Sequence, residues 1–168
     1  MNTRTGQLVA MNGLFVALTI SFQMLGFPQF ITGPIVNSML LLAALFGGPT
    51  SGILVGIMTP WIAGARGILP PPLLPMIPFI MLANSTYVMT FFLCRKAFQK
   101  EAGTVIGGIA AAIMKYLVLA AAVRFIIQVP GPIAQAMQIP QLITALIGVG
   151  VAVSVARVLQ TAGREEVF

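Results

Sequence analysis

The chain has 168 residues, of which 58% are hydrophobic and only 7% are charged, and its mean hydropathy is +1.01. So few charged side chains cannot cover the surface of a water-soluble domain, and a lipid bilayer is the one apolar surrounding of the required extent. The formal net charge is +6, but the basic residues are dispersed rather than interleaved with aromatic residues in a stripe, which argues against a nucleic-acid-binding protein.

Six apolar runs along the chain are interpreted as membrane spans. The first extends from about Leu8 to Gly26 and follows a single basic residue, Arg4, as a signal peptide also does. No small-x-small cleavage site follows it before Phe27 and Pro28, so this run is expected to remain as a true span.

The second and third runs are short and closely connected. A turn-rich segment, residues 27–34, precedes the second run, which ends at Phe46. Residues 47–49, Gly-Gly-Pro, predict a tight hairpin before the third run, residues 50–65. Both runs fall short of the roughly 20 residues of a full span, so their outer ends are expected to border a cavity rather than lipid.

A proline-rich segment separates the third and fourth spans. Residues 66–78 contain five prolines, which exclude a helix before about Ile77 and predict a stiff, extended, apolar loop. This loop is interpreted either as a lid or wall over a cavity or as an interfacial connector. The fourth span, residues 78–93, stops at Arg95 and Lys96.

The last two spans cover residues 104–127 and 138–159, with a break at Val-Pro-Gly-Pro, residues 129–132. Six spans place both termini on the same side of the membrane. With the termini inside, the cytoplasmic basic residues are Arg4, Arg95, Lys96, Lys100, Arg157 and Arg164, against Arg66 and Arg124 outside. Because positive residues favour cytoplasmic loops, we expect one all-α domain, residues 1–168, with six transmembrane helices, both termini cytoplasmic and the loop at 66–78 extracellular.

The missing residue types exclude most chemistry inside the membrane. The chain has no His and no Asp, and its acids, Glu101, Glu165 and Glu166, lie outside the apolar runs. The acids and histidines that form proton relays, sodium sites, metal sites and paired-carboxylate hydrolases are missing from the apolar runs. We therefore expect no catalytic residue, metal or cofactor. The single Cys94 is interpreted as a packing residue.

Lys115 is the most informative residue of the chain. It lies about 11 residues into the fifth span and about 9 before Arg124, which at about 1.5 Å per residue is near the middle of the bilayer. A lysine there cannot easily reach the interface, and no acid is available to pair with it. One interpretation is that backbone carbonyls, helix C-terminal ends or a shifted pKa make the buried lysine tolerable. The other is that a bound anionic or strongly hydrogen-bonding ligand pairs with it.

Other polar residues gather in the predicted outer half of the bundle. Asn84 and Tyr87 belong to a polar cluster in the fourth span, and Asn84 lies roughly 9 Å from its outer end. Asn84 and Lys115 are therefore expected to reach one cavity from different helices, although interhelical packing is an alternative for Asn84. The candidate substrate-binding residues are Lys115, Asn84, Asn37, Trp61, Arg66, Tyr87 and Gln141. Trp61 alone is also explained as an interface anchor.

Small residues line one face of the first span. Gly6, Ala10, Gly13 and Ala17 are spaced 4, 3 and 4 apart, a pattern that lets another helix approach closely. Packing within the chain and a docking groove for a partner are both open interpretations.

Several segments together resemble the substrate-binding S component of energy-coupling factor (ECF) transporters. They are the run from Ile31 to Asn37, the run from Leu40 to Pro49 with Gly52 and Gly56, the proline-rich loop ending at Pro78, and Asn84. The size and six-helix plan agree over essentially the whole chain, while the subfamily is unassigned.

This resemblance implies uptake of a vitamin or cofactor precursor across the plasma membrane of a prokaryote. S components bind their substrate tightly near the outer side and dock on a transmembrane coupling protein with two ATPases. The family docks through an Ala-x-x-x-Ala motif on its first helix, which here matches Gly13 and Ala17, with Ala10 one turn earlier. The chain has no Walker A motif, in agreement with energy supplied by the partners.

We therefore expect a small, partly apolar substrate whose carboxylate or carbonyl faces Lys115, with Asn84 as a hydrogen-bonding partner and residues 66–78 as a lid. One alternative is a stand-alone anion-selective channel or facilitator, which predicts passive flux without partners. Another is a structural subunit, which predicts no ligand. An enzyme is disfavoured by the missing acid–base residues.

Overall fold

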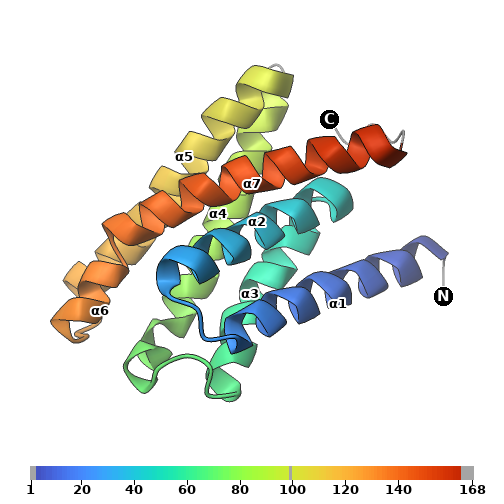
Figure 1. Cartoon of the computed structure of the whole chain (residues 1–168). Helices are drawn as coiled ribbons and strands as arrows, with labels where there is room; N and C mark the ends of the chain where they lie inside the picture. The colour runs from blue at the N-terminus through green and yellow to red at the C-terminus, as the bar shows by residue number, and fades with distance from the viewer. Residues whose placement is uncertain (1–2, 99, 164–168) are drawn as a thin grey trace.

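The computed structural model describes residues 3–98 and 100–163, and the regular elements in these ranges are all helical (Figure 1). They are α1 (Thr3–Met24), α2 (Gln29–Gly47), α3 (Pro49–Ala65), the 3-10 helix η1 (Pro71–Met76), α4 (Ile77–Ala97), α5 (Lys100–Ala121), the π-helical turn η2 (Ala122–Ile126), α6 (Gly131–Ala136) and α7 (Ile139–Gly163). The predicted all-α class is confirmed. Six long helices correspond to the six predicted runs, and five stretches have the length and hydropathy of membrane spans, whereas α3, with 17 residues, is shorter.

The long helices form a bundle with two distinct ends (Figure 1). Helices α4 and α5 pack against each other, α7 lies across α2 and α5, and α1 packs on α2 and α3 at one side. The described start of α1 and the described end of α7 lie at one end of this bundle. We call the opposite end, which carries the α1–α2 connection, η1 and α6, the loop end.

The start of α2 differs from the sequence prediction. The helix begins at Gln29 and includes Thr32 and Pro34, which the sequence predicts in a turn. Pro34 lies inside the helix, where its missing N–H removes the backbone hydrogen bond to the carbonyl of Phe30, and the Thr32 hydroxyl donates to the carbonyl of Phe27 at 2.9 Å. Helix α2 is therefore 19 residues long, so the prediction that it is short was wrong.

The proline-rich loop is more compact than the predicted extended segment. Residues 71–76 form the 3-10 helix η1, because the fixed φ of proline also suits this helix and the backbone N–H of Leu73 reaches the carbonyl of Pro70 at 2.8 Å. Met76 at its end is fully buried and packs with Ala83 and Leu119. The loop is therefore anchored in the bundle rather than extended away from it.

The predicted hairpin between α2 and α3 is confirmed. Gly48 has a φ of +86°, a conformation that favours glycine, and it reverses the chain between the two helices. The paired helices come very close at Gly52, where an added Cβ would lie 2.7 Å from the carbonyl oxygen of Leu40 and 2.7 Å from the Cβ of Ala44. Leu40 and Ala44, which contact Gly52, belong to the main hydrophobic core together with Val55 and Phe91.

Gly52→Ala should lower the thermal unfolding midpoint by several degrees, since overpacking of this kind typically costs about 1–3 kcal/mol. Gly150→Ala is the matched control, because a Cβ at this exposed helical position meets no heavy atom within 4 Å. Unfolding of both variants and the wild type in one detergent would be followed by intrinsic fluorescence. Equal midpoints for Gly52→Ala and Gly150→Ala would contradict the close α2–α3 packing.

Candidate functional site

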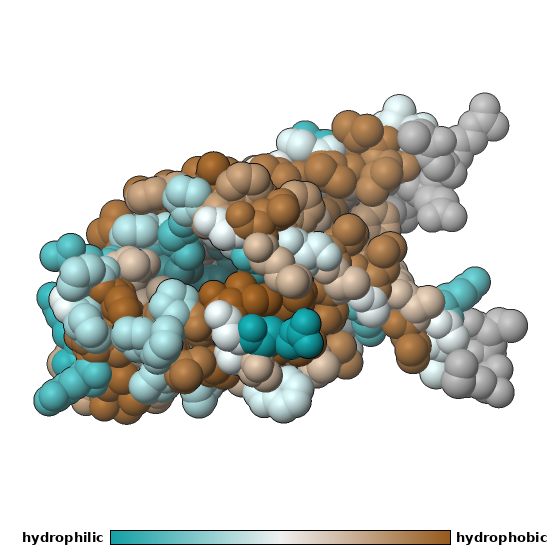
Figure 2. All heavy atoms as spheres, turned by 60° about the horizontal axis from the view of Figure 1, so that its bottom comes forward, coloured by the Kyte–Doolittle hydropathy of each residue, from teal (hydrophilic) through white to brown (hydrophobic). Residues whose placement is uncertain are grey.

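A cavity of about 90 Å³ opens at the loop end of the bundle. Figure 2 looks toward this end and shows a hollow with hydrophilic residues at its base. The cavity is lined by Gln23, Gln29, Thr32, Gly33, Val36, Asn37, Thr59, Pro60, Leu69, Leu73, Ile80, Asn84, Lys115, Leu119, Met137 and Gln141. Its wall is thus partly amide and hydroxyl groups and partly aliphatic side chains, which suits a ligand with one polar and one apolar part.

Lys115 forms the charged point of this wall. The side chain is 3% exposed, and its Nζ donates hydrogen bonds to Asn37 Oδ1 at 2.5 Å and to Asn84 Oδ1 at 2.7 Å. These contacts join α5 to α2 and α4. Two amide oxygens stabilise a buried ammonium group by hydrogen bonding, but they do not neutralise its charge.

Asn84 is held in a fixed orientation. Its Nδ2 donates to the backbone carbonyl of Gly56 on α3 at 2.9 Å, so its Oδ1 points to Lys115. A Cβ at Gly56 would lie 3.0 Å from the Cβ of Asn84, and the missing side chain therefore allows α3 and α4 to approach closely. Both ends of the Asn84 amide are engaged, which makes this residue a support for Lys115.

Tyr87 lies beneath the lysine rather than in the cavity wall. The centroid of its ring is 5.4 Å from Lys115 Nζ, within the range of a cation–π contact. Its hydroxyl is fully buried and donates to the carbonyl of Ala145 on α7 at 3.0 Å. Tyr87 thus ties α4 to α7 and gives the ammonium group a favourable aromatic face.

Two amide side chains in the cavity wall have uncommitted hydrogen-bonding groups. Asn37 is 1% exposed, and its Nδ2 makes no hydrogen bond to any described residue. Gln141, at the start of α7, is 7% exposed, and its side-chain amide likewise has no partner within residues 3–98 and 100–163. Both are buried polar groups that border the cavity, and such groups normally have a partner.

Two of the candidate residues lie elsewhere. Trp61 is 58% exposed on α3 and does not line the cavity. Arg66 is exposed at the C-terminal cap of α3 and is also outside the lining. The position of Trp61 agrees with its alternative interpretation as an interface anchor.

Other lining residues were not among the sequence candidates. Gln23, Gln29 and Thr32 come from the end of α1 and the start of α2, and Gln23 Oε1 is buried without a partner among the described residues. Met137 reaches the cavity from the turn between α6 and α7. The signal in the sequence that could have identified the residues from α1 and α2 is the pair of glutamines, Gln23 and Gln29, on either side of Pro28 in an otherwise apolar stretch.

The small residues of α1 face outward. Ala10, Gly13 and Ala17 are all exposed, and a Cβ at Gly13 would meet no heavy atom within 4 Å. These residues are therefore not used for packing within the described chain.

Comparison with known proteins assigns the chain to a family. The family model described as ECF transporter, substrate-specific component, matches residues 7–160. No curated protein and no solved structure gives a significant match. Members of this family are multi-pass binding subunits of transporters in prokaryotic plasma membranes and are not enzymes. The chain belongs to the substrate-specific component family of ECF transporters.

Proposed function

We propose that the cavity at the loop end is the high-affinity substrate site, and that it takes a small, partly apolar vitamin or cofactor precursor bearing a carboxylate or carbonyl group. The observation that carries this proposal is the buried Lys115 ammonium group at the wall of a partly apolar cavity. Lys115 and Asn37 bind the polar group, and Asn84 and Tyr87 hold the lysine in place from below. Gln141 adds a further hydrogen-bonding group from α7.

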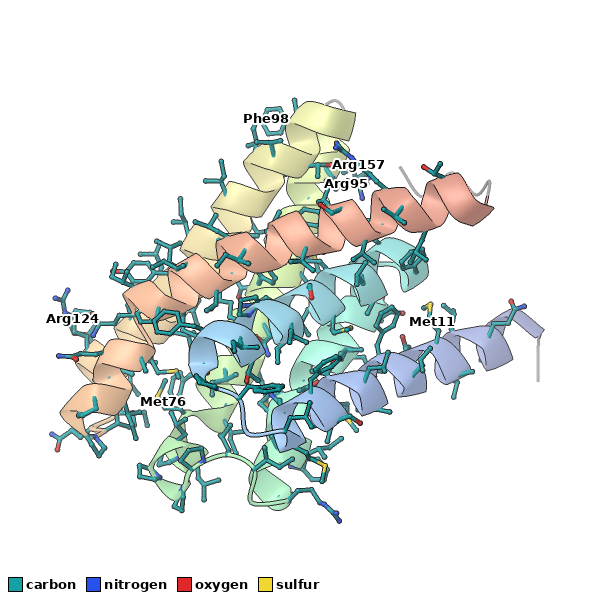
Figure 3. The ribbon with its side chains drawn as sticks, in the orientation of Figure 1. Met11, Met76, Arg95, Phe98, Arg124 and Arg157 are labelled. Carbon is teal, nitrogen blue, oxygen red and sulfur yellow. The ribbon has the colours of Figure 1, made fainter. Side chains whose placement is uncertain are left out.

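The distribution of basic residues supports an orientation with the loop end outside. Arg95 and Arg157 lie at the end of the bundle that carries the described start of α1 and the described end of α7, whereas Arg124 lies near α6 at the loop end (Figure 3). More basic residues on the termini side agree with a cytoplasmic location for that side. The chain then acts as one domain whose residues 66–78 face the exterior and cover the site.

Partner docking is assigned to the exposed face of α1. Ala10, Gly13 and Ala17 form a smooth surface that admits close approach of a helix from a transmembrane coupling protein, which in turn carries two ATPases. A chain without a nucleotide-binding motif or an intramembrane acid relies on such partners to drive uptake.

Native mass spectrometry of gently purified protein, combined with thermal-shift screening of vitamins and cofactor precursors, tests the binding function. A tight ligand raises the unfolding midpoint in proportion to the logarithm of its concentration over its dissociation constant. We expect one retained or stabilising small molecule. A protein that binds nothing in the screen yet conducts anions passively in liposomes would instead be a channel or facilitator.

Lys115→Met should weaken binding of that molecule by at least about tenfold, because the substitution removes the buried charged donor and leaves an unbranched apolar side chain one atom shorter. Lys96→Met is the control, since Lys96 is exposed in the last turn of α4, away from the cavity lining. Both affinities would be measured by titration calorimetry in lipid nanodiscs. Unchanged affinity in a folded Lys115→Met protein would remove this residue from the site.

Gly13→Leu should abolish co-purification with the coupling protein and ATPases and stop uptake, while substrate affinity stays within about twofold, because the new side chain obstructs only the exposed face of α1. Ala121→Leu places the same side chain on an exposed position of α5 and serves as the control. A normal complex with Gly13→Leu would show that docking uses another surface.

A further inference from the structure

We infer that the substrate is a monoanion, a small monocarboxylate rather than a neutral carbonyl compound, and that its carboxylate supplies the missing counter-charge of Lys115. This inference rests on the proposed function, because it concerns the ligand of the same cavity. It depends on three properties of the site, which are its net charge, the type of hydrogen-bonding groups left free, and its size.

A protonated Lys115 gives the cavity wall one positive charge without a counter-charge. Among the described residues that line the cavity, Lys115 has a charged side chain and all others are neutral. The nearest acid in the sequence, Glu101, is on the order of 20 Å away along α5. A neutral ligand would cover this charge and remove it further from water, whereas an anion would neutralise it.

The groups that remain available on Lys115 and its two asparagine partners are N–H donors. An ammonium group has three N–H bonds, and two of them are directed to Asn37 and Asn84. Both amide oxygens therefore face the lysine, and one N–H of Asn84 Nδ2 is committed to Gly56. One N–H of Lys115, the Nδ2 of Asn37 and the second N–H of Asn84 Nδ2 are left, and these donors match the acceptor-only oxygens of a carboxylate.

Charge and size together favour a carboxylate over a phosphate. A phosphate ester carries about −1.5 to −2 charges at neutral pH, more than a single lysine balances. The cavity is also small, about 90 Å³, and its remaining wall is aliphatic, with Leu73, Ile80, Leu119 and Met137. A short alkyl chain or a single ring on the carboxylate fits this wall.

Pairs of an acid and its primary amide distinguish the effect of ligand charge on binding from the effect of ligand shape. Pentanoate, benzoate and nicotinate, each beside its primary amide, would be titrated at up to about 10 mM into the full-length protein in nanodiscs, with the unfolding midpoint as the readout. We expect at least one acid to bind ten or more times more tightly than its amide. Each pair shares one carbon skeleton, so the ratio of dissociation constants reports the charge.

Asn37→Asp is the decisive variant. It keeps the acceptor oxygen for Lys115 and changes the shape very little, but it places a carboxylate inside the cavity as an internal counter-ion. Binding of the acid should fall by at least tenfold, and by clearly more than binding of its amide, because the amide loses the Asn37 donor but meets no charge repulsion. Lys115→Gln is the second variant, because it keeps a donor without the charge, and it should bring the acid-to-amide ratio close to one.

Three outcomes are distinguishable. Preference for the acid that is lost in both variants supports the inference. An amide that binds as tightly as its acid, or an acid whose affinity Asn37→Asp leaves unchanged, overturns the inference but keeps the proposed site. If no acid binds while the vitamin screen finds a neutral ligand, the inference alone fails, and if nothing binds in either experiment, the proposed function fails with it.

Discussion

One lysine, Lys115, is buried among the membrane-spanning helices, and its hydrogen bonds connect α5 to α2 and α4. It contacts two amide oxygens in the cavity wall and the ring of Tyr87 behind that wall, while the described lining residues include no acid. A buried charge is costly unless it has partners from several directions. Asn37 on α2, Asn84 on α4 and Tyr87 beneath provide them, so the lysine also connects the central helices of the fold.

The helices of the bundle are closely packed around α3, whereas one face of α1 is exposed. Gly52 and Gly56 bring α3 close to α2 and α4, and this contact positions Asn84 in the cavity wall. The face of α1 with Gly13 remains open toward the surrounding membrane. The proposed substrate site at the loop end and the proposed docking face on α1 are therefore separate surfaces of one small chain.

The sequence predicts the membrane spans and the meeting of Lys115 with Asn84, because hydropathy and the depth of a polar residue along its span decide these features. Hydropathy gave the spans, and the depth of Lys115 and Asn84 along their spans predicted that they meet. The orientation of each helix about its axis depends on packing, so the outward position of Trp61 and the inward position of Gln23 were not predictable from spacing. The compact 3-10 helix that begins at Pro71 was missed because proline suits both extended and 3-10 backbone.

A cryo-EM or crystal structure of the protein purified with its retained ligand would show directly whether Lys115 binds the substrate. We expect ligand density in the loop-end cavity, with carboxylate oxygens within hydrogen-bonding distance of Lys115 Nζ and Asn37 Nδ2 and an apolar part against Leu73 and Met137. A ligand bound elsewhere, with Lys115 still held by Asn37 and Asn84 alone, would contradict this expectation.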